Sequence, residues 1–413
     1  MRPKLFLTFS LLLFLLGCSG WNQSKEKSES PDWPMEYKNL ARTSSFGQPA
    51  IPPLTLKWKF KADNAIYGNP AVVNGAVYFI TRFGHCYALD SKTGKQIWEK
   101  NIHTAGFDNS LVVDKGIIYS NDGFALSTTD GGILWKGSAW SEYPAFVTDS
   151  VVYYGQGGSY WTRLDVKTGK QSNYYIECCP VIGATIVDKY LVNFGTLGEL
   201  EVWNTNLQSN GYPKKEFDIP YRERPEGGST FAVGLNRYLY IPTASISSAS
   251  SSFGIMACDL KKPKKKGEAP LIWHTKVEES TSPSYYKGIV YTGNNPVTAL
   301  DAKIGKILWT TYLPQKINQK MYNPLESIAV MTSPAVSHQW VYISSLANNF
   351  VQYLYILDSN NGKILQQEQL SQPRNDSFYS QYFNTPAVVD GWVYVGSIDS
   401  CLYAFQGQEE KKN

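Results

Sequence analysis

The stretch Asn69–Trp98, NPAVVNGAVYFITRFGHCYALDSKTGKQIW, decides the fold of this chain. It holds short apolar runs separated by the turn signals Asn-Gly, Phe-Gly and Asp-Ser-Lys-Thr-Gly, which predict an antiparallel unit of four strands. The expected strands are Ala71–Val73, Ala76–Thr81, His85–Leu89 and Gln96–Ile102. Such a sheet alone would expose apolar surface and two open edges, so it needs neighbours of the same kind.

The start of this unit returns along the chain, which gives eight repeats in all. The further starts lie at Asn109–Val112, Tyr143–Phe146, Cys179–Val181, Thr230–Val233, Ser282–Ser284, Ser333–Val336 and Thr385–Val388. Self-similarity at a fixed period is the signature of a repeat architecture.

The Asp-x-x-x-Gly turn and a following tryptophan also recur. The turn returns at Asp165–Gly169, Asp301–Gly305 and Asp358–Gly362, and in shortened form at Thr129–Gly132. Trp98, Trp135, Trp273 and Trp309 occupy the fourth run of their repeats, and Asn173, Lys215 and Gln366 take that place in others. The motif is therefore degenerate.

The eighth repeat stops at Cys401–Phe405 and lacks its fourth run, whereas an unassigned run, Leu56–Phe60, precedes the first repeat. We expect this N-terminal strand to complete the last blade. The prediction is an all-β fold, an eight-bladed β-propeller of four-stranded antiparallel blades, closed so that only short outer edges remain.

The segment Ala88–Trp98 resembles the repeat of the PQQ-like β-propeller family, the quinoprotein alcohol-dehydrogenase-like proteins. The lead-in, with Asp32–Met35, Arg42-Thr43 and Pro53–Trp58, is similar to the start of bacterial members. The resemblance covers roughly Trp33 to Phe405. It implies the fold, but catalytic quinoproteins and non-catalytic scaffolds share these repeats, so it leaves the activity open.

The first residues of the sequence are expected to form a targeting signal. Arg2 and Lys4 precede the apolar stretch Leu5–Leu16, which is too short to span a bilayer. Its ending, Leu-Leu-Gly-Cys18, resembles a bacterial lipobox, which implies lipidation of Cys18; an ordinary cleaved signal peptide is the alternative. Ser19 and Gly20 follow, without the Asp that resembles an inner-membrane retention signal. We therefore expect a lipid anchor in the outer membrane and an extracytoplasmic location.

The expected organisation is a lipoprotein signal peptide at 1–17, the lipidated Cys18 with a polar tether at 18–31, the propeller at 32–407 and a polar tail at 408–413. Removing Met1–Gly17 takes away Arg2 and Lys4 but no acidic residue, which leaves 37 basic and 35 acidic side chains. This balance gives no reason to expect nucleic-acid binding, and we expect a monomer.

Cysteines and histidines give no metal spacing. We expect Cys258, which replaces Leu89 in its repeat, to lie in the core. Cys86 and Cys401 fall on neighbouring strands one register apart, which argues against a disulfide between them. The histidines are spread over different repeats, where they are expected to be surface or hydrogen-bonded residues: His85, His103, His274 and His338.

The adjacent pair Cys178-Cys179 is expected at the mouth of the central channel. In an oxidising compartment it could form a vicinal disulfide, and some PQQ dehydrogenases carry such a ring against the cofactor. A quinoprotein also needs Ca²⁺ ligands, a base and an arginine. Residues that could approach the same mouth are Asp108, Asn109, Glu177 and Arg222, without a fixed geometry. No cofactor is expected; PQQ with Ca²⁺ is the alternative.

Long insertions fall on one rim of the predicted ring, at Asp218–Ser229, Thr243–Phe253, Pro314–Thr332 and Ser371–Asn384. Loops that grow on one side of a rigid ring usually serve recognition. The predicted partner-binding residues are aromatic or cationic: Tyr221, Arg222, Arg224, Tyr322, Phe378, Tyr379 and Phe383. The basic run Lys261–Lys266 is expected on the opposite side and is interpreted as a solvated loop, with weak attraction to acidic lipid or protein as the alternative.

Residues at the starts of the first strands should converge on the channel mouth. These candidates are Asn69, Asn109, Tyr143, Cys178, Cys179, Thr230, Ser282, Ser333 and Thr385. The favoured hypothesis is a membrane-anchored, non-catalytic scaffold that binds envelope proteins and resembles BamB-type propellers of outer-membrane protein assembly. A PQQ-dependent dehydrogenase and a propeller that binds a small molecule or glycan remain alternatives.

Overall fold

The computed structural model describes most of the chain between Asp32 and Glu409. The described residues are 32–35, 38–39, 42–45, 48–102, 110–138, 146–148, 150–156, 160–177, 181–195, 199–207, 213–220, 232–247, 250–261, 271–278, 281–293, 295–314, 316–317, 320–321, 330–346, 351–372 and 384–409. Their regular structure is all β, and the predicted signal peptide and tether lie outside them.

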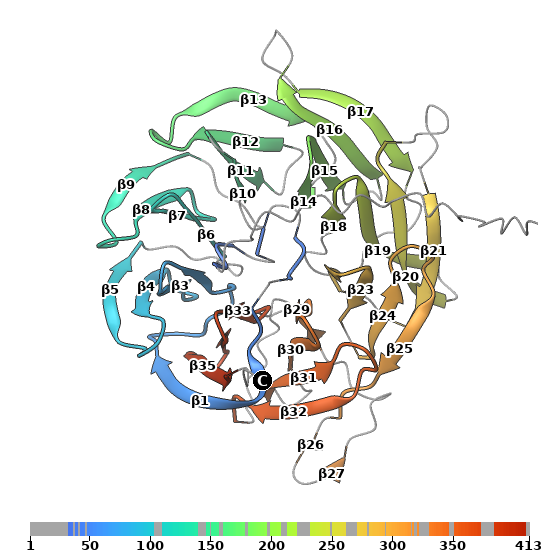
Figure 1. Ribbon diagram of the computed structural model, residues 1–413. Helices are drawn as coiled ribbons and strands as arrows, with labels where there is room; N and C mark the ends of the chain where they lie inside the picture. The colour runs from blue at the N-terminus through green and yellow to red at the C-terminus, as the bar shows by residue number, and fades with distance from the viewer. Residues whose placement is uncertain are drawn as a thin grey trace, which may run out of the picture. The chain divides into compact units, whose positions relative to one another are not determined.

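The sheets form an eight-bladed propeller, as predicted (Figure 1). Within a blade, consecutive strands pair antiparallel from the innermost to the outermost. Blade 1 comprises β2 (Ala71–Val73), β3 (Ala76–Ile80), β4 (His85–Asp90) and β5 (Gln96–Asn101). Blade 2 comprises β6 (Leu111–Asp114), β7 (Ile117–Ser120), β8 (Phe124–Ser127) and β9 (Ile133–Lys136). Blade 3 comprises β10 (Phe146–Val147), β11 (Val151–Gln156), β12 (Tyr160–Asp165) and β13 (Gln171–Glu177).

The next three blades have the same order. Blade 4 comprises β14 (Val181–Val187), β15 (Tyr190–Gly195), β16 (Glu199–Leu207) and β17 (Pro213–Pro220). Blade 5 comprises β18 (Val233–Leu235), β19 (Tyr238–Ser247), β20 (Ser250–Asp259) and β21 (Leu271–Val277). Blade 6 comprises β22 (Ser284–Tyr286), β23 (Ile289–Thr292), β24 (Val297–Asp301) and β25 (Ile307–Thr311).

Blade 7 has an innermost strand in two pieces, because β28 and β29 both pair with β30. Its strands are β28 (Val330–Met331), β29 (Ala335–Ser337), β30 (Trp340–Leu346), β31 (Gln352–Asp358) and β32 (Ile364–Gln369). Blade 8 is formed by β33 (Ala387–Val389), β34 (Trp392–Gly396), β35 (Cys401–Gln408) and, as its outermost strand, β1 (Ile51–Lys61).

The predicted ring closure is confirmed. β1 pairs antiparallel with β35, from Ile51 opposite Gln408 to Lys61 opposite Cys401. The strand is longer than the predicted run Leu56–Phe60, because the ladder continues past it at both ends. The first strand of the body thus completes the last blade, and the ring has no open seam.

The ring has two faces, which differ in the turns that they carry. The turn face carries the turns between first and second strands, such as Asn74-Gly75, and those between third and fourth strands, such as Asp90–Gly94. The loop face carries the turns between second and third strands, such as Thr81–Gly84, and the connections between blades.

The tryptophan of one blade latches onto the turn of the next, which explains why the motif repeats. The indole N–H of Trp98 donates to the Thr128 carbonyl of blade 2 at 2.9 Å. The ring lies so close to Gly131 that a Cβ there would stand 2.7 Å from an indole carbon. Glycine is therefore required at position 131 for two reasons, the close contact with the indole and the φ of +70°.

The same latch recurs around the ring. Trp58 of blade 8 meets Gly94, Trp135 meets Gly169, Trp273 meets Gly305, and Trp309 meets Gly362. Where Gln366 replaces the tryptophan, its amide accepts from the Leu54 backbone N–H at 2.6 Å and donates to the Leu54 carbonyl at 2.8 Å. The degenerate position therefore still joins blade 7 to blade 8.

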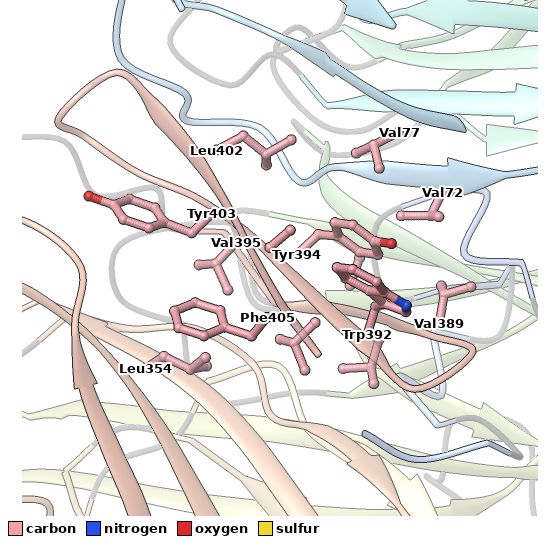
Figure 2. Packing of buried hydrophobic residues seen from close by; sticks show 14 of the residues in the cluster. Val72, Val77, Leu354, Val389, Trp392, Tyr394, Val395, Leu402, Tyr403 and Phe405 are labelled. Atoms are coloured by element: carbon pink, nitrogen blue, oxygen red, sulfur yellow. The ribbon is translucent and has the colours of Figure 1, made fainter. Parts of the chain in front are cut away.

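The core lies between neighbouring blades. One cluster joins blades 7, 8 and 1, where Trp392 and Tyr394 pack near Val72 and Val77 (Figure 2). These side chains are buried because each blade presents one apolar face to the next. Burial of such side chains contributes roughly 1.5–3 kcal/mol each, so a blade is stable only with its neighbours.

The prediction of two long loops was partly wrong, because some of their described residues form paired strands. Within Thr243–Phe253, the described residues extend β19 and β20, whose pairing runs from Thr243 opposite Gly254 to Ser247 opposite Ser250. The insertion is thus a longer hairpin, because an antiparallel ladder can simply continue. Within Pro314–Thr332, β26 (Lys316–Ile317) pairs with β27 (Lys320–Met321), and Val330-Met331 forms β28.

Candidate functional site: the central channel

The lead-in before β1 occupies the central channel, the space that the innermost strands enclose (Figure 1). It begins on the turn face, where the Asp32 carboxylate accepts from the Asn74 backbone N–H at 3.2 Å. Trp33 then pairs with Val72 through two backbone hydrogen bonds of 2.7 and 2.8 Å. Next, the Pro34 carbonyl accepts from Val113 of blade 2 at 2.8 Å. These bonds satisfy backbone groups at the open inner edges of two blades.

The lead-in reverses direction inside the channel. The Lys38 N–H donates to the Met35 carbonyl and the Arg42 N–H to the Asn39 carbonyl, both at 2.9 Å, as in two consecutive turns. The side chain of Asn39 fixes the second turn, since its amide donates to the Thr43 hydroxyl at 2.7 Å. Asn often stabilises turns through such local bonds.

Beyond the turns the segment crosses to the other side of the ring. The guanidinium Nε of Arg42 donates to the Ala184 carbonyl of blade 4 at 2.7 Å. The Thr43 carbonyl accepts from Tyr285 of blade 6, and the Ser44 carbonyl accepts from Val336 of blade 7 at 2.8 Å. Arg42 is only 2% exposed, so a cation lies buried at the centre of the ring. Such a group is costly to bury without hydrogen bonds.

The segment leaves the channel by the turn face again. Ser45 pairs parallel with Val336 of β29, which runs towards that face. The Ala50 carbonyl accepts from the buried Tyr342 hydroxyl at 2.6 Å, and β1 begins at the next residue, opposite Gln408. The described residues of the lead-in, 32–35, 38–39, 42–45 and 48–50, therefore form a plug that starts and ends on the turn face. The irregular sequence of this segment gave no sign of the plug.

The described candidates for the channel mouth are buried rather than solvent-lined. Asn69, Ser282, Ser333 and Thr385 are at most 4% exposed. The other candidates lie outside the described residues: Asn109, Tyr143, Cys178, Cys179 and Thr230. Their convergence on a ligand site stays a prediction.

A buried glutamine that sequence analysis missed joins blades 7 and 8. Gln352 is 1% exposed, and its amide donates to the Ser344 hydroxyl at 2.9 Å and to the Gly396 carbonyl at 3.0 Å. Its backbone N–H donates to the Ser371 hydroxyl at 2.8 Å. The only signal in the sequence was a polar residue at the start of an apolar run.

The position of the plug is relevant to the alternative prediction that the protein binds PQQ. A flat, multiply charged quinone on the ring axis needs an open slot, and the described middle of the channel is filled by buried residues of the plug, including Trp33 and Ser44. At this depth the described residues do not fit such a group. The described residues also contain no group of three His, Cys, Asp or Glu side chains arranged to hold a metal ion.

The described cysteines behave as core residues, as expected for Cys258. Cys86, Cys258 and Cys401 are buried free thiols, so the doubted disulfide between Cys86 and Cys401 is absent. Burial raises the pKa of the Cys86 and Cys258 thiols to about 12. A thiol that stays protonated is a poor nucleophile, which gives these two residues a packing role.

The three described histidines have hydrogen-bond partners, as expected, and His338 contacts the Ser337 hydroxyl at 3.2 Å. His85 contacts the Glu99 carboxylate at 2.6 Å and the Asn101 amide at 2.7 Å. His274 contacts the Thr243 hydroxyl at 3.0 Å. By contrast, the predicted partner-binding residues all lie outside the described part of the chain: Tyr221, Arg222, Arg224, Tyr322, Phe378, Tyr379 and Phe383.

The repeats, the latches and the closed ring define a PQQ-like β-propeller. The chain belongs to the family described as outer membrane protein assembly factor BamB, whose model matches residues 55–175 and 265–413. Across the described residues no helix has the length and apolar character to cross a membrane.

Individual relatives differ in activity. Tetrathionate hydrolase of Acidithiobacillus ferrooxidans is 22% identical over 82% of this chain and 51% of the hydrolase. BamB of Salmonella typhimurium is 34% identical over 23% of this chain and 26% of that protein. The dehydrogenase subunit of the quinone-type alcohol dehydrogenase of Gluconobacter oxydans is 20% identical over 76% of this chain and 40% of the subunit.

These matches span about half or less of each curated relative's length. Among solved structures, BamB from Moraxella catarrhalis is similar with a TM-score of 0.61 and 15% identity, covering 86% of this chain and 99% of that one. At this identity the likeness is one of fold.

Proposed function

We propose that this protein is a lipid-anchored, non-catalytic scaffold of the cell envelope that binds envelope proteins, in the manner of BamB-type assembly factors. The observation that carries the proposal is the plug. It fills the middle of the channel, where an axial ligand would lie, with Trp33, Arg42 and Ser44 bonded to or packed among the inner strands. A ring filled in this way is a rigid support for loops, and loops on rigid supports commonly carry recognition.

Membership of the BamB family and the predicted lipobox at Cys18 support an anchored, extracytoplasmic protein. In this proposal partners bind the loop face, because the predicted aromatic and arginine residues belong to long connections between blades. Such residues are enriched at protein interfaces. No cofactor belongs to this function.

Photo-crosslinking in the native envelope tests the scaffold. A photoreactive amino acid at Tyr221 or Phe378 should give specific adducts with envelope proteins, whereas the same probe at Lys303 on the turn face should not. The variant Arg222→Ala should weaken the adducts without lowering the thermal midpoint. Adducts confined to the turn face would contradict the assignment of the partner face.

A PQQ-dependent dehydrogenase is the second candidate, favoured by the relationship to the Gluconobacter oxydans dehydrogenase subunit over most of this chain. The purified protein should be mixed with PQQ and Ca²⁺, with a quinoprotein dehydrogenase as the positive control. Bound-quinone absorbance together with dye reduction on alcohols or sugars would overturn the scaffold proposal. The scaffold predicts that PQQ elutes entirely with the free small molecules.

A further inference from the structure

The turn-face end of the outer strands carries a β-bulge that repeats from blade to blade. In blade 1, Ala88 pairs with Trp98 and Leu89 with Gln96, so Ile97 is the extra residue of the bulge. Blades 2, 5, 6 and 7 have the same register shift, and their extra residues are Leu134, Ile272, Leu308 and Leu365, respectively. A bulge redirects the side chain that it inserts.

All of these bulge residues are large aliphatics, and they are between 43% and 53% exposed. Blade 8 has Lys57 in this place, next to the exposed Leu56. In blade 4 the register shift leaves the charged Glu216 as the extra residue, and the outer strand of blade 3 begins with the polar pair Gln171-Ser172. In ring order the aliphatic blades 5, 6, 7, 1 and 2, with blade 8 among them, therefore form one continuous arc. Single exposed aliphatics need no explanation, but a repeated set on one rim does.

The turns of the same face are rich in exposed lysines. They include Lys92, Lys95, Lys167, Lys170, Lys287, Lys303, Lys306 and Lys363, beside the exposed Ile304. The aspartates of the Asp-x-x-x-Gly turns are engaged internally. For example, hydrogen bonds from the Thr93 side chain and backbone lower the pKa of Asp90. The exposed aspartates described on this face are Asp130, Asp188 and Asp390. Lysines thus supply most of its exposed charge.

The first described residue after the predicted tether, Asp32, lies on this face and within this arc. The described chain begins at Asp32, bonded to Asn74 of blade 1. A flexible polar chain of the length of residues 18–31 has a root-mean-square span of roughly 20 Å. An anchor at Cys18 would therefore hold the turn face of blade 1 near the bilayer, whereas the loop face would require the tether to pass round the ring.

From these observations we propose that the turn face, along the arc from blade 5 through blade 8 to blade 2, is a membrane-contact surface that lies on the bilayer carrying the anchor. This inference rests on the lipid anchor of the proposed function. The aliphatics would sit at the headgroup boundary and the lysines on acidic phosphates, a combination that stabilises peripheral binding. The loop face would then point away from the membrane, free to bind partners.

The full lipoprotein, reconstituted in vesicles of phosphatidylethanolamine and phosphatidylglycerol, provides the test. A fluorescent amino acid replaces Ile304 on the turn face or, as the matched control, Phe83, which is 56% exposed on the loop face. Lipids brominated in the upper acyl chain should quench the probe at Ile304 at least twofold and leave the probe at Phe83 unchanged. The triple variant Ile97→Ser, Leu134→Ser, Leu308→Ser should halve the quenching, whereas Phe83→Ser should not.

Each other outcome has a distinct meaning. Quenching at Phe83 alone would show that the loop face meets the membrane and would overturn the proposal. Vesicle-bound protein with neither probe quenched would show a body held off on its tether, which overturns the membrane contact but leaves the anchor intact. Protein that fails to float with vesicles would refute both the anchor and the contact surface.

Discussion

Trp33 and Val72 exchange two backbone hydrogen bonds, so the lead-in adds a further pairing partner at the inner edge of blade 1. The exposed edge of a sheet is a template for association, and in a propeller the inner edges face the channel. Here the chain covers several of them with its own plug. The indole of Trp33 is fully buried by this arrangement.

Trp33→Ala should lower the free energy of unfolding by about 3–5 kcal/mol, because a fully buried tryptophan leaves a large cavity. Amide hydrogen exchange at Val72 and Val113, whose N–H groups donate to the plug, should accelerate in the same variant. Gln48→Ala, an exposed change within the plug segment, is the control. Unchanged exchange at Val72 would contradict the role of the plug.

Gly94→Ala should destabilise the ring where it closes. Gly94 has a φ of +68°, and a Cβ there would stand 2.6 Å from the Trp58 indole. Gly75→Ala is a matched control, because Gly75 also has a positive φ, +77°, but nothing within 4 Å of the added carbon. Chemical unfolding should show a loss of about 1–2 kcal/mol for the control from backbone strain, and a clearly larger loss for Gly94→Ala.

The two halves of that latch should be coupled. In the background of Trp58→Ala, the additional cost of Gly94→Ala should fall towards that of Gly75→Ala, since the clashing ring is gone. A double-mutant cycle measures this coupling. Strict additivity of the two substitutions would show that the contact between Trp58 and Gly94 does not determine the strain.

Cys18→Ala should release the protein from membranes into the soluble extracytoplasmic fraction, because the thiol that carries the predicted anchor is removed. Ser19→Ala is the control and should remain membrane-bound. Fractionation with detection by antibody measures the distribution. Wild-type protein that is already fully soluble would refute the anchor.

Stability should fall on the alkaline side. Burial raises the pKa of Cys86 and Cys258 from 9.0 to about 12, and burial is also the main cause that raises the pKa of Tyr119 and Tyr291 from 10.0 to about 12. The folded state favours the protonated forms, so their contribution is complete below pH 9 and is lost as the pH rises from 9 to 12.

Urea midpoints measured across that range should decline steadily. The double variant Cys86→Val, Cys258→Val, which nearly preserves volume, should show its decline beginning nearer pH 10, where the tyrosines start to titrate. A midpoint that stays constant up to pH 12 would contradict the burial of these groups.

The sequence by itself determined the eight blades and their closure, because the signals are local and repeated. Asn74-Gly75 and Asp90–Gly94 dictate turns, and the apolar runs between them dictate strands. The recurring glycine and tryptophan, such as Gly94 and Trp98, give each such repeat one residue for the contact with the preceding blade and one for the contact with the next. Leu56–Phe60 was identified as the closing strand only because the last repeat was incomplete. Even Gln366, which replaces the tryptophan, lies at the same distance from its turn glycine, Gly362, as Trp98 does from Gly94.

Only the tertiary structure decided what fills the channel. Residues 32–50 have no periodicity, and their bonds join Trp33 to blade 1, Arg42 to blade 4 and Ser44 to blade 7, far apart along the chain. The extension of the β19–β20 hairpin was not predicted for a related reason. Its serine-rich sequence is typical of a loop, and only the pairing of the two strands makes it part of the sheet. The apolar character of the bulge residues, such as Ile97, can be seen in the sequence. Their outward direction arises from strand register, which pairing across the blade fixes and which a single strand does not encode.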